Sequence, residues 1–280
     1  MNSASASPGG RRAGPGGRLF DRLGRETRAA RLPAGPGDET PVTEADLAGL
    51  PSPARRYLRF MGVVGRPRDW SFRTRFTGRF RMRPGMGWLP AEAWQYNSAI
   101  AVSRVFVMRV RLARVLPMTG RDVYTGGHGH MLGKLLGLIP VASGTGEEFD
   151  ISELTTYLND AVMIAPSFLL RPEVTWARVN AESFDVTLSD AGRSVTGRVF
   201  LDGQGAPVDF ATTDRFAALP GSLRRAEWRT PVPEWTKIGG RPVPGRFSAV
   251  WHLTEGDFSY IEGRLDLARM AFNVPPASPG

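Results

Sequence analysis

Cysteine is absent from this chain of 280 residues. Its absence excludes a disulfide framework, a thiolate nucleophile and every zinc or iron–sulfur site that needs cysteine ligands. A chain without disulfides suits a reducing compartment.

Long hydrophobic runs are also missing. The first 40 residues contain seven arginines and no apolar stretch long enough for the core of a signal peptide. The longest apolar stretch, residues 131–142, is interrupted by Lys134 and Pro140, and it is much shorter than the roughly 20 residues of a membrane-spanning helix. We therefore predict a cytoplasmic protein without a transmembrane segment.

Lysine is scarce, because Lys134 and Lys237 are the only two and arginine supplies almost all of the positive charge. The formal net charge is +9; residues 1–40 hold seven Arg against four acids (+3), which leaves +6 for the remainder. An arginine excess spread over the whole chain predicts no specific nucleic-acid partner. It does not indicate an oligomeric state.

Residues 1–40 are rich in Gly, Pro, Ala, Ser and Arg and poor in large apolar side chains. This composition predicts a disordered arm, in which residues 18–31 form a helix only transiently or against an acidic surface. No internal repeat and no linker-like change of composition follows, so we expect residues 41–275 to form a single α+β domain.

A period of two begins at Trp70. Phe72, Phe76 and Phe80 fall on one side of this segment, and five arginines between Arg73 and Arg83 fall on the other, as in a long β-strand. Further short strands are expected at 94–97, 106–112, 123–125, 131–141, 174–179, 184–188, 195–201, 208–213, 228–237, 246–253 and 260–272. Such a pattern excludes a doubly wound parallel sheet and predicts a large curved, mainly antiparallel β-sheet, or half-barrel.

One main helix is predicted at residues 150–165. Leu154, Leu158 and Ala161 recur there at helical spacing, and Asp150 with Glu153 resembles a capping box. We expect this helix to pack on the concave face of the sheet. Thr43 and the pair Ser52–Pro53 predict a short N-terminal helical region that includes residues 53–61.

A concave sheet face is larger than one helix can cover, and space left there would bind an apolar or amphipathic, lipid-like small molecule. The same aromatic and methionine side chains would also suit a filled core, so this alternative stays open. The candidate lining residues are Trp94, Phe106, Met108, Met131, Leu154 and Leu158.

Two other functions stay open. His128 and His130 share one face of a predicted strand, and either of them, or His252, would form an enzyme site with a nearby carboxylate. Two histidines do not make a metal site, so neither a metal nor another cofactor is predicted. The chain has no G-x-S-x-G elbow, P-loop or H-E-x-x-H motif, and it leaves the question of catalysis undecided.

The third possibility is a basic interaction module. The arginine face of the strand from Trp70 and the basic arm would then contact an acidic partner or an anionic membrane surface.

Several segments together resemble an uncharacterised bacterial family of unknown function, over about residues 45–273. They are Leu50–Pro53 with Arg56–Leu58, the Arg/Phe strand, Gly129–Met131 with Lys134–Gly137, Glu148–Leu158 and Val250–Leu253. The order of long strands, a central helix and more strands is also similar to LolA-like lipoprotein-carrier half-barrels, whose concave face holds acyl chains. That similarity implies the fold alone.

Overall fold

A single antiparallel sheet of 15 strands dominates the computed structural model, which describes residues 15–35, 39–112, 116–136, 138–219 and 222–276. The helices are α1 (Pro15–Ala29), α2 (Glu44–Leu47), α3 (Ser52–Phe60) and α4 (Glu147–Ile164), with 3-10 turns at η1 (Pro166–Leu169) and η2 (Leu267–Arg269). No helix in the described ranges is both long and apolar enough to cross a membrane.

The first half of the sheet is a meander, and the strands after α4 vary in length from two to 13 residues. The strands are β1 (Ser71–Phe80), β2 (Leu89–Ser98), β3 (Ser103–Leu112), β4 (Leu116–Thr125), β5 (His128–Leu135), β6 (Ile139–Gly144), β7 (Val174–Arg178), β8 (Ser183–Asp190), β9 (Arg193–Leu201), β10 (Pro207–Thr212), β11 (Phe216–Leu219), β12 (Ser222–Arg225), β13 (Glu227–Arg229), β14 (Glu234–Ile238), β15 (Arg241–Leu253), β16 (Gly256–Leu265) and β17 (Ala271–Phe272).

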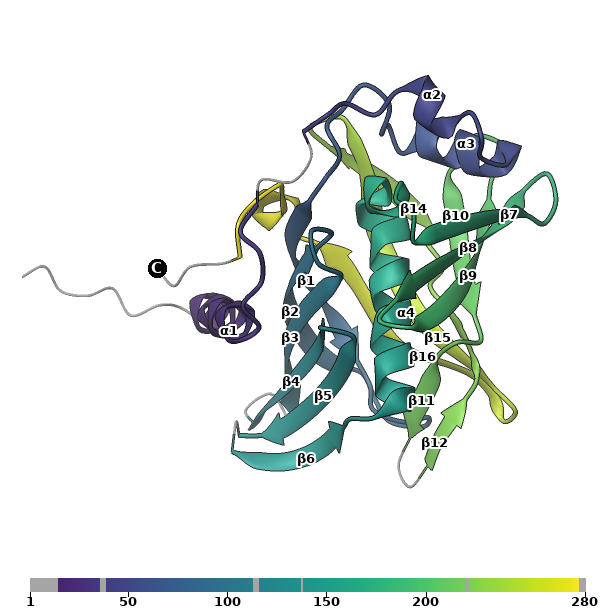
Figure 1. Ribbon diagram of the computed structural model, residues 1–280. Coiled ribbons are helices and arrows are strands. Elements are labelled where there is room, and N and C mark those ends of the chain that lie inside the picture. Colours follow the sequence, from purple (N-terminus) through teal and green to yellow (C-terminus); the bar gives the residue numbers. More distant parts are fainter. Residues whose placement is uncertain (1–14, 36–38, 113–115, 137, 220–221, 277–280) are drawn as a thin grey trace, which may run out of the picture.

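The strand order is β6-β5-β4-β3-β2-β1-β16-β15-β13-β10-β9-β8-β7, with β14 beside β15 and β17 beside β1, while β11 and β12 form a separate hairpin. The sheet is open, since β6 and β7 do not pair with each other. It curves around α4, which lies in its hollow (Figure 1). The predicted fold, a large curved antiparallel sheet with one main helix on its concave face, is confirmed.

Helix α4 docks on the sheet through its N-terminal turn. The carboxylate of Asp150 accepts the backbone N–H of Gly129 at 2.7 Å and lies 2.7 Å from the guanidinium of Arg193. The predicted capping box is therefore wrong, because Asp150 bonds to β5 and β9 and not to its own helix. Gly129 is required for this approach, since a Cβ on it would lie 2.2 Å from the carbonyl oxygen of Phe149.

The short helices α2 and α3 confirm the predicted N-terminal helical region. Asp46 accepts the backbone N–H of Thr43 at 2.7 Å and so stabilises the start of α2. The hydroxyl of Tyr57 in α3 donates to the carbonyl oxygen of Val162 at 2.7 Å. Through this bond α3 holds the C-terminal end of α4.

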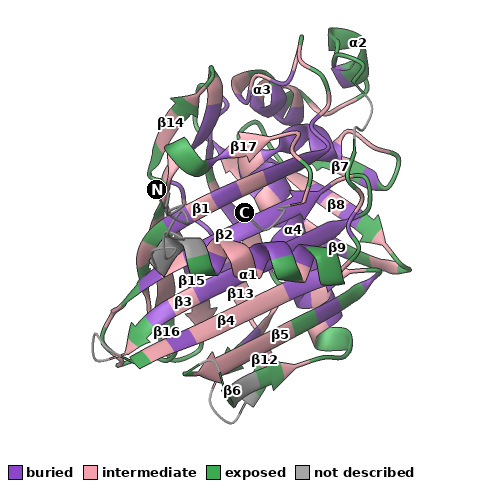
Figure 2. Cartoon of the chain, turned by 90° about the vertical axis from the view of Figure 1, so that its left-hand side faces the viewer, coloured by how far each residue is buried: buried purple, intermediate pink, exposed green. Residues whose placement is uncertain are grey.

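Helix α1 contradicts the predicted disordered arm over residues 15–35. It lies across the convex face of the sheet (Figure 2), where Leu19 and Leu23 are buried against Val105 and Val107 of β3. The ring of Phe20 packs 4.7 Å from that of Trp94. The convex face carries enough apolar surface to order this segment, which composition alone does not reveal. Residues 1–14 of the predicted arm lie outside the described residues.

The docking of α1 is tested by Leu23→Ala, because the side chain of Leu23 is completely buried. We expect the free energy of unfolding to fall by about 2–4 kcal/mol in urea denaturation, since the substitution leaves a cavity. Arg25→Ala, at an exposed position of the same helix, is the control and should leave stability within about 0.5 kcal/mol of the wild type. Equal stability of the two variants would mean that α1 does not pack on the sheet.

Candidate functional site

Helix α4 crosses the sheet near one end of its strands. Its polar contacts with β2, β3 and β5 lie on or next to one row of paired residues, in which Gly129 pairs with Tyr124, Tyr124 with Arg104, and Arg104 with Asn97. It also contacts β9 and β15. At the end of this row the hydroxyl of Tyr157 donates to the carbonyl oxygen of Ser98 at 3.0 Å. The rest of the concave face lies beyond the helix.

A buried charged cluster joins α4 to this row. The guanidinium of Arg104 donates from Nε to Asp160 at 2.7 Å and from Nη1 to Glu153 at 3.0 Å. The amide groups of Gln95 and Asn97 donate to the same Asp160 oxygen, at 2.6 and 3.2 Å. We call Gln95, Asn97, Arg104, Asp122, Glu153, Asp160 and Arg215 the concave polar cluster.

Two acids of this cluster have raised pKa values. Burial and, next, the negative charge of Asp122 raise the pKa of Glu153 to about 7 against the attraction of Arg104 and Arg215. Burial also raises the pKa of Asp122. A carboxyl group that titrates near neutral pH exchanges protons readily and donates a hydrogen bond when neutral. The cluster therefore suits a ligand with a polar or charged group.

Arg215 faces the cluster from the opposite wall of the half-barrel. Its Nη1 donates to the hydroxyl of Tyr260 at 2.9 Å, and its guanidinium lies 4.1 Å from the ring centroid of Trp228. Its Nε is buried without a hydrogen-bond partner among the described residues. Asp122 likewise has no hydrogen bond or ion pair there, although both residues keep part of their surface exposed.

An apolar surface continues from the cluster along the concave face. We call it the concave floor, and none of its members comes from α4. Phe76 stacks with Phe106 at 5.7 Å and meets Phe247 edge-on at 5.2 Å. The floor consists of Phe76, Phe80, Leu89, Ala91, Ala93, Phe106, Met108, Val110, Leu112, Met118, Phe247, Ile261 and Leu265, of which six are only half-buried.

The predicted lining residues divide between three places. Phe106 and Met108 lie on the floor, and Met131 pairs with Asp122 and so shares its face of the sheet. Leu154 and Leu158 are fully buried in the core around α4. Trp94 lies on the opposite, convex face beneath α1, since side chains alternate along β2 and its neighbour Gln95 is the one that points inward.

The three histidines are not brought together. His128 and His130 are exposed on β5, with Nδ1 of His128 3.6 Å from Asp150. His252 lies on β15, several strands away, with its Nδ1 2.7 Å from Asp257. No group of three or more His, Asp or Glu side chains within the described ranges could hold a metal ion.

Two arginines of the face that begins at Trp70 pair with acids. Arg75 pairs with Asp266 at 2.7 Å and with Glu92 at 3.2 Å, and Arg79 pairs with Glu262 at 2.6 Å. These ion pairs neutralise Arg75 and Arg79, whereas Arg73 and Arg81 form no ion pair with a described residue and pack on the rings of Phe20 and Trp88.

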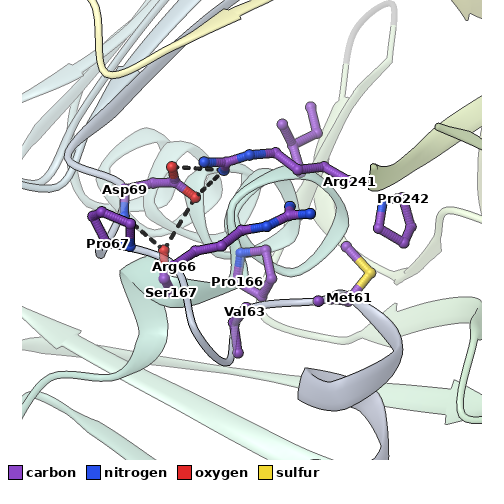
Figure 3. Close-up of a pocket in the computed structure, with 11 residues that line it drawn as sticks. Met61, Val63, Arg66, Pro67, Asp69, Pro166, Ser167, Arg241 and Pro242 are labelled. Atoms are coloured by element: carbon purple, nitrogen blue, oxygen red, sulfur yellow. Dashed lines mark hydrogen bonds and ion pairs between the residues drawn. The ribbon is translucent and has the colours of Figure 1, made fainter. Parts of the chain in front are cut away.

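A small hollow lies at the other end of α4, where Asp69 accepts two bonds from Arg241, at 2.6 and 2.7 Å, and one from Ser167 at 3.2 Å (Figure 3). Its volume of about 10 Å³ holds at most one water molecule. A second hollow is lined by Ala34, Gly35, Glu39, Pro67, Arg68, Trp70 and Asn273. The first hollow is too small for an organic ligand.

Sequence reasoning missed most of the polar cluster. Arg104 is in phase with Phe106 and Met108 on β3, so a charged residue at an inward position was the available signal. Glu153 and Asp160 are seven residues apart and therefore lie on one face of α4. Their pairing with Arg104 depends on a contact between a helix and a strand about 50 positions apart, which no local pattern reveals.

The raised pKa of Glu153 predicts a specific pH dependence of stability. Between pH 4.5 and 7 the carboxyl of Glu153 binds its proton more tightly in the folded than in the unfolded protein. Its contribution to the free energy of unfolding therefore falls as pH rises through this window and is constant above it. Relative to the wild type, Glu153→Gln should therefore gain stability from pH 4.5 to 7.5, by at most about 3 kcal/mol. Chemical denaturation of both proteins at several pH values measures this difference in the free energy of unfolding. A constant difference would refute the raised pKa.

Comparisons with known proteins give a family and distant structural relatives. A search of curated proteins found no match. Among solved structures, a domain from Vibrio parahaemolyticus described as an outer membrane lipoprotein-sorting protein is 11% identical, covering 72% of this chain and 85% of that chain, with a TM-score of 0.40. A LolA superfamily protein from Nitrosomonas europaea is 13% identical, covering 78% of this chain and 91% of that chain, with a TM-score of 0.37. A DUF1329 family protein from Desulfovibrio piger is 11% identical, covering 79% of this chain and 92% of that chain, with a TM-score of 0.41.

All three TM-scores lie below 0.5, and the identities lie between 11% and 13%. The family model that matches covers residues 40–263 and so extends over most of the chain. The chain belongs to the family of unknown function DUF6544.

Proposed function

We propose that the protein binds a lipid-like amphipathic molecule on its concave face, with the apolar chain on the concave floor and an acidic head group at Arg215. The observation that carries this proposal is the contact between unpartnered polar groups and a half-buried apolar surface that α4 does not cover. The relatives named above lend no weight to it.

The polar end of the site offers two groups to a ligand. The Nε of Arg215 is buried without a hydrogen bond among the described residues, which costs about 1–3 kcal/mol. Asp122 is half-buried and forms no hydrogen bond or ion pair with a described residue. A carboxylate or phosphate would satisfy the guanidinium of Arg215, whose planar donors match such groups. Burial raises the pKa of Asp122, so protonation of this residue beside a bound anion is less costly.

The apolar end has room for a chain. From Asp122 to Leu116, β4 spans six residues along the floor, or roughly 20 Å at about 3.3 Å per residue. Phe80, Leu89 and Leu112 close to that end are half-buried, so an alkyl chain laid over them would remove apolar surface from water. The gain is about 25 cal/mol for each Å² covered.

Binding of dodecanoate, measured by calorimetry, tests the proposal. We expect dodecanoate to bind and dodecyltrimethylammonium to bind at least about tenfold more weakly, because Arg215 selects an anion. Met131→Glu should weaken dodecanoate binding by about tenfold or more, since it places a charge beside the floor.

The matched control is His130→Glu, which makes the same charge change one residue away on the opposite face of β5. It should leave the affinity unchanged. No binding of dodecanoate, or an equal loss in both variants, would contradict the proposal.

A further inference from the structure

We infer that the protein docks on an anionic membrane surface through one end of its sheet. This end is formed by the tips of the β1–β2, β3–β4 and β5–β6 hairpins. We call its described apolar and basic residues the hairpin rim, and they are Met82, Arg83, Arg111, Leu116, Lys134, Leu136, Leu138 and Ile139. The inference goes beyond the small-molecule binding proposed above and does not depend on it.

Strand register places the three tips together. Phe80 pairs with Leu89, Leu112 with Leu116, and Leu135 with Ile139, so each hairpin turns at the same level of the sheet. The backbone N–H of Leu136 donates to the carbonyl oxygen of Pro117 at 2.8 Å and joins the second tip to the third. The tips of β4 and β5 point away from α4 (Figure 1).

The tips expose large apolar side chains to water. The exposed fractions are 37% for Met82, 44% for Leu116, 48% for Leu136, 79% for Leu138 and 56% for Ile139. The last two are the highest values for a large hydrophobic residue in the described part of the chain. Contiguous exposed apolar residues of this kind mark a surface that meets a partner.

The charge next to these side chains is positive. Arg111 lies on β3 and Lys134 on β5, with β4 between them, and neither forms an ion pair with a described residue, unlike Arg75 and Arg79 of β1. Aliphatic tips flanked by unpaired cations match an anionic lipid surface, where apolar groups enter the acyl boundary and cations meet the head groups.

Trp88, at the first tip, also suits a membrane surface. The guanidiniums of Arg79 and Arg81 lie 4.6 and 4.4 Å from the ring centroid of Trp88. Tryptophan and arginine, with an apolar body and a polar end, both favour the membrane–water interface. The apolar side chains protrude from separate turns instead of lining a groove, which favours insertion into lipid over the docking of a folded partner.

Site-specific labelling tests the docking directly, because the chain has no native cysteine. Leu138→Cys and Ile100→Cys each provide one thiol for an environment-sensitive fluorophore. Ile100 is 41% exposed and lies in the β2–β3 turn at the opposite end of the sheet. With vesicles of phosphatidylcholine and about 30% phosphatidylglycerol, the label at position 138 should shift to the blue and the label at position 100 should not. No shift at 138, or equal shifts at both positions, would overturn the inference.

Vesicle sedimentation with charge variants gives a second test. Leu138→Glu should weaken binding to the anionic vesicles by about tenfold or more, whereas Ile100→Glu should have no effect. Binding of the wild type should fall in about 0.5 M salt and on vesicles of phosphatidylcholine alone. Unchanged binding of Leu138→Glu would overturn the inference. So would lipid-free self-association that Leu138→Glu abolishes, because the hairpin rim would then meet a second copy of the chain.

Discussion

The ionic contact between Arg104 and the acids of α4 determines how the rest of the molecule is arranged. Arg104 is buried at the point where the helix crosses the sheet, and it bonds to both Glu153 and Asp160. Burial alone would lower the pKa of Arg104, but the charges of Asp160 and Glu153 outweigh that effect and raise it. A buried ion pair of this kind adds little net stability compared with apolar residues of the same shape. We interpret it as fixing the position of α4, because any other register would leave charges buried without partners.

The position of α4 divides the concave face into two parts. One part forms the main core with Leu154, Tyr157 and Leu158. The other, the concave floor, receives no residue from the helix and leads from Asp122 to the hairpin rim. On the convex face α1 covers Trp94 and Tyr96. Near the row where α4 crosses, the helix covers the concave face of these strands and α1 covers the convex face, which leaves the floor for a ligand.

The sequence predicts the sheet and α4 because both depend on local periodicity. The alternation of Phe72, Phe76 and Phe80 with arginines corresponds to β1. The helix predicted at residues 150–165 is α4, which spans residues 147–164. The sequence does not show which face of a strand is concave. The prediction that Trp94 lies on the ligand side is wrong for this reason, since an aromatic residue beneath α1 has the same sequence pattern as one beneath α4.

Composition misled in a similar way at the N-terminus, where Leu19 and Leu23 lie among Gly, Pro and Arg residues. Their burial depends on Val105 and Val107, more than 80 residues later in the chain. The concave polar cluster is likewise built from β2, β3, β4, α4 and the residues before β11, so its members meet only in the folded sheet. The cytoplasmic location stays a prediction.

The most direct measurement is a crystal structure of the protein with dodecanoate. The account predicts an unmoved α4, still joined to Arg104, with the carboxylate at Arg215 and the alkyl chain over Met108 and Met131 towards the hairpin rim. A chain bound elsewhere, or one that displaces α4 from Arg104, would contradict it.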